Sequence, residues 1–328
     1  MEQAADRSIL KVSSLHKQFP VYGSFGKIGG AKAYVNAVTD VSLQLNEGET
    51  YGLVGESGSG KSTTGRTILG LTPASQGQVL YRDRELAAMT REEMRNFRKD
   101  VQLVFQDPFS SLNPRKRIGR MLEEPLIIHK MGDKAERQET VFRILQTVGL
   151  QPEHAFRFPH EFSGGQRQRL GLARALIMNP KIIVCDEPVS ALDVSIQSQI
   201  LNMLKRLQRG MKLTLLFITH DISVVRYISD RIGIMYLGKI MEEALTDDLF
   251  HEPLHPYTKA LFSAVPDFNR SRLKERIMLR GEIPSPISPP SGCVFHTRCP
   301  YATDVCRTDI PAVREVRPGH KVACHFVD

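Results

Sequence analysis

The strongest constraint on the fold is the glycine-rich stretch Gly55-Glu56-Ser57-Gly58-Ser59-Gly60-Lys61-Ser62. It matches G-x-x-x-x-G-K-[ST], in which backbone N–H groups surround phosphates, Lys reaches the terminal phosphates and Ser ligates Mg²⁺. Before it, Thr50 to Val54 is a short apolar run that predicts a strand. After it, Lys61 to Leu69 predicts a helix that stops at Gly70. This order of strand, loop and helix predicts an α/β fold with a nucleotide phosphate site.

A second apolar run, Ile182 to Cys185, ends in the two carboxylates Asp186 and Glu187. Buried parallel strands have this pattern, and ligands bind at the carboxyl ends of such strands. Asp186 is suitably placed to hold Mg²⁺, and Glu187 could orient or deprotonate a water aimed at the γ-phosphate. The alternative is a pair of solvated carboxylates at a strand end.

The third motif is Ser163-Gly164-Gly165-Gln166, an S-x-x-Q capping box that opens a helix with Leu170, Ala173 and Leu176 on one face. Two glycines directly after the cap cost about 1 kcal/mol each relative to Ala. This cost indicates that another group approaches the bare backbone, and a helix N-terminus favours an anion such as phosphate. The alternative is a capped surface helix with incidental glycines.

These three stretches occur together with Gln106, with Ser190 to Asp193 and with Thr219-His220-Asp221. In this order the set resembles the Walker A, Q-loop, signature, Walker B, D-loop and H-loop of ABC transporter ATPases, over residues from about 10 to 245. The resemblance implies that ATP and Mg²⁺ are bound and that Gln106, Glu187 and His220 are catalytic. It also implies a dimer, because the signature motif of one subunit faces the ATP held by the other.

The resemblance assigns a complete ligand set. Mg²⁺ would be held by Ser62, Gln106 and Asp186. The nucleotide would be contacted by Phe19, Gly55, Glu56, Ser57, Gly58, Ser59, Gly60, Lys61, Ser62, Thr63, Gln106, Asp186, Ser163, Gly164, Gly165 and Gln166. Within the set, Phe19 would stack on adenine, with Tyr22 as a rival and a core aromatic at a strand end as the alternative.

The order of these motifs along the chain predicts two regions. Residues 1–245 would form the ATPase core, with a helical subdomain at about 110–162 that carries the signature motif, and residues 246–328 would form a small irregular C-terminal extension. The composition of the whole chain, with 41% hydrophobic and 24% charged residues, is ordinary for a folded protein. The formal charge of +8 is compatible with nucleic acid, anionic lipid or nucleotide and decides between none of them. We expect neither a signal peptide nor a membrane-spanning helix.

The extension contains four of the five cysteines, Cys293, Cys299, Cys306 and Cys324, spaced C-x₅-C-x₆-C-x₁₇-C. Disulfides are not expected in a cytosolic, cysteine-poor chain, and zinc usually shows tighter pairs. Cys185 is interpreted as a small core residue. The array, with His255-Pro256-Tyr257-Thr258, resembles the C-terminal extension of dipeptide and oligopeptide importer ATPases, where it can ligate a [4Fe–4S] cluster. Zinc and free thiols remain alternatives. The array is remote from the phosphate loop in sequence, so we expect it to stabilise the extension.

The whole chain therefore resembles the ATP-binding subunits of bacterial dipeptide and oligopeptide ABC importers. The resemblance implies two transmembrane permease subunits, a second ATPase subunit that is a paralogue or a second copy, and indirectly a periplasmic binding protein. It implies a peripheral location on the cytoplasmic face of the inner membrane, and no nucleic-acid partner. Importers of nickel, glutathione or opines are alternatives, because nothing in this chain would contact the cargo. An ABC-type DNA-repair ATPase is a weaker alternative, because such proteins carry coiled coils or zinc modules in place of the compact helical insertion.

Overall fold

The computed structural model describes residues 7–22, 30–107, 112–264 and 277–327. Parts of the glycine-rich and lysine-rich stretch before Ala31 and of the charged stretch before Arg280 lie outside these residues. The chain divides into two compact units, one of Met1–Ala88 with Thr219–Asp328 and one of Met89–Ile218. The first unit joins the N-terminal and C-terminal parts of the sequence, and the expected boundary at 245/246 stays a prediction.

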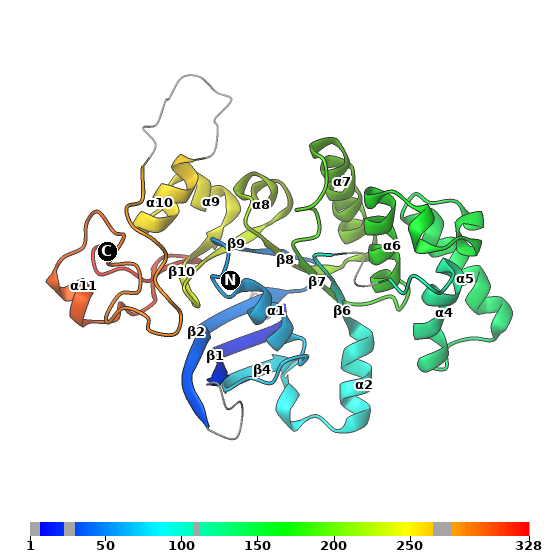
Figure 1. Ribbon diagram of the computed structural model, residues 1–328, viewed down its shortest axis with the longest axis horizontal. Helices are drawn as coiled ribbons and strands as arrows, with labels where there is room; N and C mark the ends of the chain where they lie inside the picture. The colour runs from blue at the N-terminus through cyan, green and yellow to red at the C-terminus, as the bar shows by residue number, and fades with distance from the viewer. Residues whose placement is uncertain (1–6, 23–29, 108–111, 265–276, 328) are drawn as a thin grey trace, which may run out of the picture. The chain divides into compact units, whose positions relative to one another are not determined.

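The first unit contains an antiparallel sheet in the order β2-β1-β4-β5 (Figure 1). Its two long strands extend beyond Leu10 to Phe19 and Ala37 to Leu45, the runs that the sequence indicates as strands. Antiparallel pairing extends them, since Tyr22 still pairs with Ala31 at the far end. The strands are β1 (Ser8–Tyr22), β2 (Ala31–Asn46), β4 (Gln76–Tyr81) and β5 (Arg84–Glu85).

A second set of strands in this unit carries the glycine-rich loop. β3 pairs in parallel with β9, β9 pairs antiparallel with β10, and β12 joins β10 to β11. The short charged hairpin of β11 and β12 was not predicted from the sequence. The strands are β3 (Thr50–Val54), β9 (Arg231–Tyr236), β10 (Lys239–Leu245), β11 (Arg314–Arg317) and β12 (His320–Val322).

Short helices connect these strands, and two of them, α8 and α10, begin at a side-chain cap. Asp221 caps one by accepting hydrogen bonds from Ser223 and Val224, and His255 Nδ1 caps another by accepting from Tyr257 N–H. The helices of this unit are α1 (Lys61–Ile68), α8 (Ile222–Ile228), α9 (Thr246–His251), α10 (Pro256–Ser263), α11 (Asp304–Thr308) and the 3-10 turn Leu86–Ala88.

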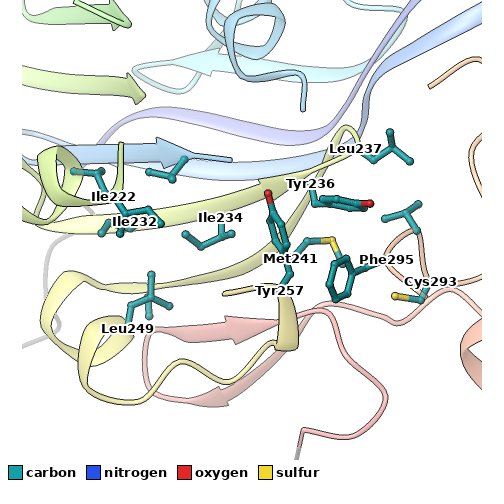
Figure 2. Close-up of a cluster of buried hydrophobic side chains, with 14 of the residues drawn as sticks. Ile222, Ile232, Ile234, Tyr236, Leu237, Met241, Leu249, Tyr257, Cys293 and Phe295 are labelled. Atoms are coloured by element: carbon teal, nitrogen blue, oxygen red, sulfur yellow. The ribbon is translucent and has the colours of Figure 1, made fainter. Parts of the chain in front are cut away.

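One hydrophobic core serves both the strands around the loop and the C-terminal segment (Figure 2). Val54 at the end of β3 and Ile234 on β9 belong to the same buried cluster as Tyr257, Cys293 and Phe295. The C-terminal segment therefore completes the core beneath the glycine-rich loop.

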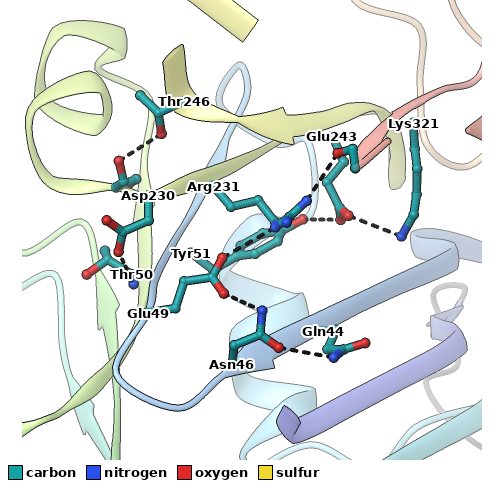
Figure 3. Close-up of polar contacts among 12 residues, drawn as sticks. Gln44, Asn46, Glu49, Thr50, Tyr51, Asp230, Arg231, Glu243, Thr246 and Lys321 are labelled. Atoms are coloured by element: carbon teal, nitrogen blue, oxygen red, sulfur yellow. Dashed lines mark hydrogen bonds and ion pairs between the residues drawn. The ribbon is translucent and has the colours of Figure 1, made fainter. Parts of the chain in front are cut away.

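Polar contacts also tie β3 to the strands that follow it late in the sequence (Figure 3). Thr50 N–H donates to Asp230 Oδ2 over 2.8 Å, and Tyr51 Oη donates to Glu243 Oε2 over 2.7 Å. Lys321 of β12 reaches the other oxygen of Glu243 over 3.3 Å. Burial raises the pKa of Tyr51 well above its usual value, so its hydroxyl stays a donor to this carboxylate.

The second unit consists of three parallel strands and a group of helices. β6, β7 and β8 pair in this order, and β7 and β8 are fully buried apolar runs as expected of parallel strands, whereas β6 contains the partly exposed Gln102. Their bounds are β6 (Val101–Val104), β7 (Ile182–Asp186) and β8 (Thr214–Thr219).

The helices of this unit include α4 and α5, which lie within the expected helical subdomain at about 110–162 and pack against α6 (Figure 1). Pro125 lies inside α4, which continues past it to Ile128, and the Pro125 carbonyl accepts a hydrogen bond from His129 N–H. The helices are α2 (Arg91–Asp100), α4 (Ile118–Ile128), α5 (Lys134–Thr147), α6 (Gly164–Leu176), α7 (Val194–Met211) and the 3-10 turns Pro152–Phe156 and Pro159–Glu161.

Among the helices in the described ranges, none combines the length and the apolar character that a membrane crossing requires.

Candidate functional site

The glycine-rich loop leaves the fully buried strand β3 and runs directly into α1. Two of its glycines are required by geometry. A Cβ on Gly55 would lie 2.0 Å from the Met235 carbonyl oxygen, and one on Gly60 would lie 2.1 Å from that of Ala37. Gly60 also has φ of 101°, in the region that favours glycine. The loop is thus pressed against its own sheet, while Ser57 and Gly58 are exposed to solvent.

Lys61 lies across this loop and is only 4% exposed. Its Nζ donates to the carbonyl oxygens of Gly55 over 2.7 Å and Glu56 over 2.8 Å, and lies 3.3 Å from Ser59 Oγ. These contacts hold a positive charge at the start of α1, beside the backbone N–H groups of the loop. Ser62 and Thr63 follow on the first turn of this helix and are partly exposed. The arrangement is suited to an anionic phosphate chain.

Aromatic residues on the antiparallel sheet offer stacking surfaces, but the structure does not select one. Phe19 and Tyr22 are each 40% exposed, and Lys17 Nζ lies 4.9 Å from the centre of the Phe19 ring. Tyr34 on β2, which the sequence reasoning did not consider, is 50% exposed. An aromatic residue on the strand that pairs with β1 was the signal that could have identified Tyr34 as a third candidate.

His220 follows β8 directly, as predicted, and is exposed. The next residue, Asp221, caps α8, so the backbone on both sides of the histidine is fixed.

In the second unit, the structure brings Gln106 and Glu187 together. Gln106 follows β6, and its Nε2 donates to Glu187 Oε2 over 2.9 Å. Asp186 ends β7 and is 2% exposed. Because β6 and β7 are parallel neighbours, their carboxyl ends deliver all three side chains to one edge.

Glu187 has a strained backbone, with φ of 47° at a residue that is not glycine. The conformation costs about 1–3 kcal/mol and persists only when neighbours hold it. Glu187 N–H donates to the Ile218 carbonyl over 2.9 Å, and the Glu187 carbonyl accepts from Ser190 Oγ over 3.1 Å. Such strain is concentrated at functional sites.

The Ser163 to Gln166 stretch forms the predicted capping box. Gln166 N–H donates to Ser163 Oγ over 3.4 Å, and Ser163 N–H donates to Gln166 Oε1 over 3.0 Å. The two glycines have different explanations. A Cβ on Gly165 would lie 2.5 Å from Ile196 Cγ2 on α7, so this glycine is required by packing within the chain, while Gly164 and Ser163 are exposed. Only Ser163 and Gly164 thus present an open helix N-terminus.

The four C-terminal cysteines line one cavity of about 480 Å³, together with residues of α10. The β11–β12 hairpin returns the chain to this place, with Gly319 at φ of 74° in its turn. Burial raises the pKa of Cys293 to about 11, and the nearby thiols of Cys306, Cys299 and Cys324 act in the same direction. Within the described residues, no group of three or more His, Cys, Asp or Glu side chains is placed to hold a metal ion.

Cys185 lies apart from this array, inside β7, and is fully buried. Burial raises the pKa of its thiol to about 12, which is the behaviour of an inert core residue.

The sequence reasoning missed two residues at the glycine-rich loop. Arg298 forms a two-point ion pair with Glu56, and Tyr257 Oη accepts a hydrogen bond from Glu56 N–H over 3.2 Å. The HPYT stretch contains Tyr257, and Cys299 directly follows Arg298, but neither pattern gave an indication of a contact with the loop.

Comparison with known proteins matches two separate parts of the chain to two family models. The family model described as ABC transporter matches residues 38–190, and the model described as oligopeptide/dipeptide transporter, C-terminal region, matches residues 241–306. The oligopeptide transport ATP-binding protein AppF of Bacillus subtilis (strain 168) is 51% identical and covers 99% of both chains. OppF of Salmonella typhimurium (strain LT2), also named an oligopeptide transport ATP-binding protein, is 52% identical over 90% of this chain and 89% of its own.

Solved structures agree on the fold. The ATP-binding cassette MJ0796, in a dimeric post-hydrolysis state bound to ADP and Pi, is 30% identical with a TM-score of 0.64, covering 72% of this chain and 98% of that chain. This confirms the predicted α/β ATPase cassette. The chain belongs to the ABC transporter family, among the ATP-binding proteins of oligopeptide transport.

Proposed function

We propose that this chain is the ATP-hydrolysing subunit of an ABC importer that drives uptake of dipeptides or oligopeptides. The observation that carries the ATPase part is the contact between Gln106 and Glu187, directly after the buried Asp186. The peptide part is supported by the C-terminal region at 241–306 and by the names of the relatives. Nickel, glutathione or opine import remains an alternative for the cargo.

In this proposal the loop from Gly55 to Thr63 binds the phosphates of ATP. Its backbone N–H groups face the oxygens, and Lys61 neutralises charge on the β- and γ-phosphates. Phe19 or Tyr22 stacks on the adenine ring. Mg²⁺, when bound, neutralises the terminal phosphates, and Ser62, Asp186 and Gln106 are oxygen donors of the type it prefers.

Glu187 acts as the general base that takes a proton from the attacking water. Gln106 orients the carboxylate by its hydrogen bond to Oε2. His220 donates a hydrogen bond to the γ-phosphate. Ser163 to Gln166 contact the ATP of a second ATPase subunit, with which this chain forms a dimer.

The partners follow from this role. We propose two permease subunits, a paralogous or identical ATPase subunit, and a periplasmic binding protein that acts through the permease. The chain then lies at the cytoplasmic face of the inner membrane without crossing it. In the domain assignment we propose, residues 1–245 are the nucleotide-binding domain, about 110–162 its helical subdomain, and 246–328 the extension.

The transport assignment is tested with the complete transporter in vesicles. ATP hydrolysis and uptake are measured with a labelled dipeptide, a labelled tetrapeptide, Ni²⁺ and glutathione. We expect uptake of peptide and loss of that uptake in a Glu187→Gln variant. Uptake of Ni²⁺ or glutathione without peptide would reassign the cargo, and hydrolysis unaffected by Glu187→Gln would remove the catalytic assignment.

We also propose a [4Fe–4S] cluster in the cysteine cavity. The donor set fits, because four soft thiols line one cavity. A [4Fe–4S] cluster takes four Cys thiolates as ligands, which is the number of cysteines that line this cavity. Cys293, Cys299, Cys306 and Cys324 would hold it.

Metal analysis of anaerobically purified protein tests this proposal. A cluster gives brown protein with broad absorbance near roughly 400 nm and about four iron and four sulfide per chain. Cys299→Ser should remove the colour, while Cys185→Ser, a buried cysteine outside the cavity, should retain it. Colourless protein with one zinc per chain, or with no metal, would contradict the cluster.

A further inference from the structure

The C-terminal region holds Glu56, the second residue of the glycine-rich loop, at two points. Arg298 Nη1 donates to Glu56 Oε2 over 2.7 Å, and Nη2 donates to Oε1 over 3.2 Å. Tyr257 Oη accepts the Glu56 N–H over 3.2 Å. The remaining backbone group, the Glu56 carbonyl, accepts from Lys61 Nζ. The side chain and both backbone polar groups of this loop residue are therefore fixed.

Arg298 is itself held rigidly. Its side chain is 9% exposed, and its guanidinium lies 5.8 Å from the centre of the Tyr236 ring. Tyr236 packs edge-on against Tyr257 at 4.8 Å and against Phe295 at 5.2 Å between ring centres (Figure 2). Arg298 N–H also donates to the Phe295 carbonyl over 3.0 Å. The ion pair thus rests on an aromatic cluster and differs from a solvent-exposed pair.

The position of Glu56 gives the ion pair an electrostatic consequence. Its carboxylate sits on the loop that binds phosphate, and its side chain is only 26% exposed. An uncompensated negative charge there would repel the nucleotide, and partial burial limits screening by salt. A two-point Arg–carboxylate contact both neutralises this charge and fixes its direction.

A second ion pair in the same region offers a contrast. Arg317 contacts both oxygens of Glu252 over 2.5 and 2.9 Å, but both side chains are 52% exposed, and Glu252 follows α9 outside the loop. Like the Arg298 pair, it joins a guanidinium to a carboxylate at two points. Unlike that pair, it is exposed to solvent and involves no residue of the glycine-rich loop.

We propose that Arg298 is a positioning residue for the glycine-rich loop: by fixing and neutralising Glu56, it makes the affinity for nucleotide depend on the C-terminal region. The inference rests on the proposed ATP function of this loop. Arg298 directly precedes Cys299, and Cys299 N–H donates to the Phe295 carbonyl over 3.0 Å within the same turn. The segment that supplies a thiol to the cavity therefore also supplies the guanidinium to the loop, and the extension is a working part of the nucleotide site.

The test measures binding of Mg²⁺ and the non-hydrolysable analogue AMP-PNP to the full chain by calorimetry, together with thermal unfolding. Arg298→Met should raise Kd about tenfold, because Glu56 keeps its charge and loses its partner. The matched control Arg317→Met should stay within about twofold of the wild type. Adding Glu56→Gln to Arg298→Met should recover part of the lost affinity, since the unpaired charge is then gone. A merely structural role for Arg298 would not give this recovery.

Arg298→Lys retains the charge but not the two-point contact, so its Kd should lie between those of wild type and Arg298→Met. This variant decides the question if Arg298→Met does not unfold cooperatively. In the complete transporter, the substitution should raise KM for ATP more than it lowers kcat. Wild-type affinity in Arg298→Met or in Arg298→Lys would overturn the inference while leaving the ATPase assignment intact. Failure of the wild-type chain to bind the analogue would instead remove the proposed function.

Discussion

Gln106 Nε2 donates a hydrogen bond to Glu187 Oε2 over 2.9 Å, although 81 residues separate the two. The bond joins the ends of two neighbouring parallel strands, β6 and β7. It orients the carboxylate at a residue whose own backbone is strained, with φ of 47°. Orientation of a base by a second polar group is the arrangement that proton transfer from a positioned water requires.

Glu187→Gln should leave ATP binding intact and lower turnover by about 10²–10⁴-fold, because the amide cannot accept the proton. Hydrolysis by the complete transporter measures turnover, and equilibrium binding to the isolated chain measures affinity. Glu139→Gln, an exposed glutamate on α5 in the same unit, is the matched control and should change neither. An unchanged turnover in Glu187→Gln would exclude this residue as the base.

Lys61→Ala should weaken nucleotide binding as well as hydrolysis. The ammonium would neutralise phosphate charge, and it also holds the Gly55 and Glu56 carbonyls of the loop. Calorimetry with Mg²⁺ and AMP-PNP measures the loss, and thermal unfolding shows whether the loop change reaches the core. Tight binding by a folded Lys61→Ala protein would contradict the role of Lys61.

Ser163→Arg should spare binding to the chain's own loop and block assembly of the ATP-bound dimer. Ser163 is exposed at the N-terminus of α6, so an arginine there has room and obstructs a partner, while loss of the side-chain cap costs about 1 kcal/mol. Size-exclusion chromatography with ATP, in a Glu187→Gln background that prevents turnover, measures the dimer. Gln138→Arg on the exposed face of α5 is the control. If Ser163→Arg abolished binding to the isolated chain, the motif would act within one subunit.

The local motifs were predictable because each is encoded within a few residues. The strand Thr50–Val54 has the predicted bounds, and the capping box at Ser163 has the predicted hydrogen bonds. Gly165 shows the limit of such reasoning. Its absent side chain is explained by Ile196 of the next helix, which no local pattern reveals.

Contacts between distant segments were not predictable. Arg298 and Glu56 are 242 residues apart, and no local pattern links the cysteine segment to the loop. The structure instead places Arg298 on Glu56 and packs Phe295 in the core beneath β3 and β9. The β11–β12 hairpin escaped notice because its strands of four and three residues carry mainly charged side chains.

Stability of the first unit should depend on pH through His255, which is 1% exposed. Its Nδ1 accepts the Tyr257 N–H at the start of α10, so that nitrogen carries no proton. Burial lowers the pKa of His255 to about 4, the charge of Lys259 adds to this, and Glu242 opposes it. In the unfolded chain the pKa is about 6.5.

Because the folded pKa is depressed, the unfolded chain binds the proton more readily between these two values. The contribution of His255 to stability is therefore fully present above about pH 6.5 and is lost as the pH falls toward 4. At about 1.4 kcal/mol per pKa unit, the loss amounts to about 3 kcal/mol at most.

His255→Asn keeps a side chain that caps helices and removes the titration. Chemical denaturation at pH 7.5, 6 and 5 should give a shallower decline in the free energy of unfolding for His255→Asn than for the wild type. The exposed neighbour His251→Asn should retain the wild-type decline. Equal declines for wild type and His255→Asn would show that His255 does not couple folding to protonation.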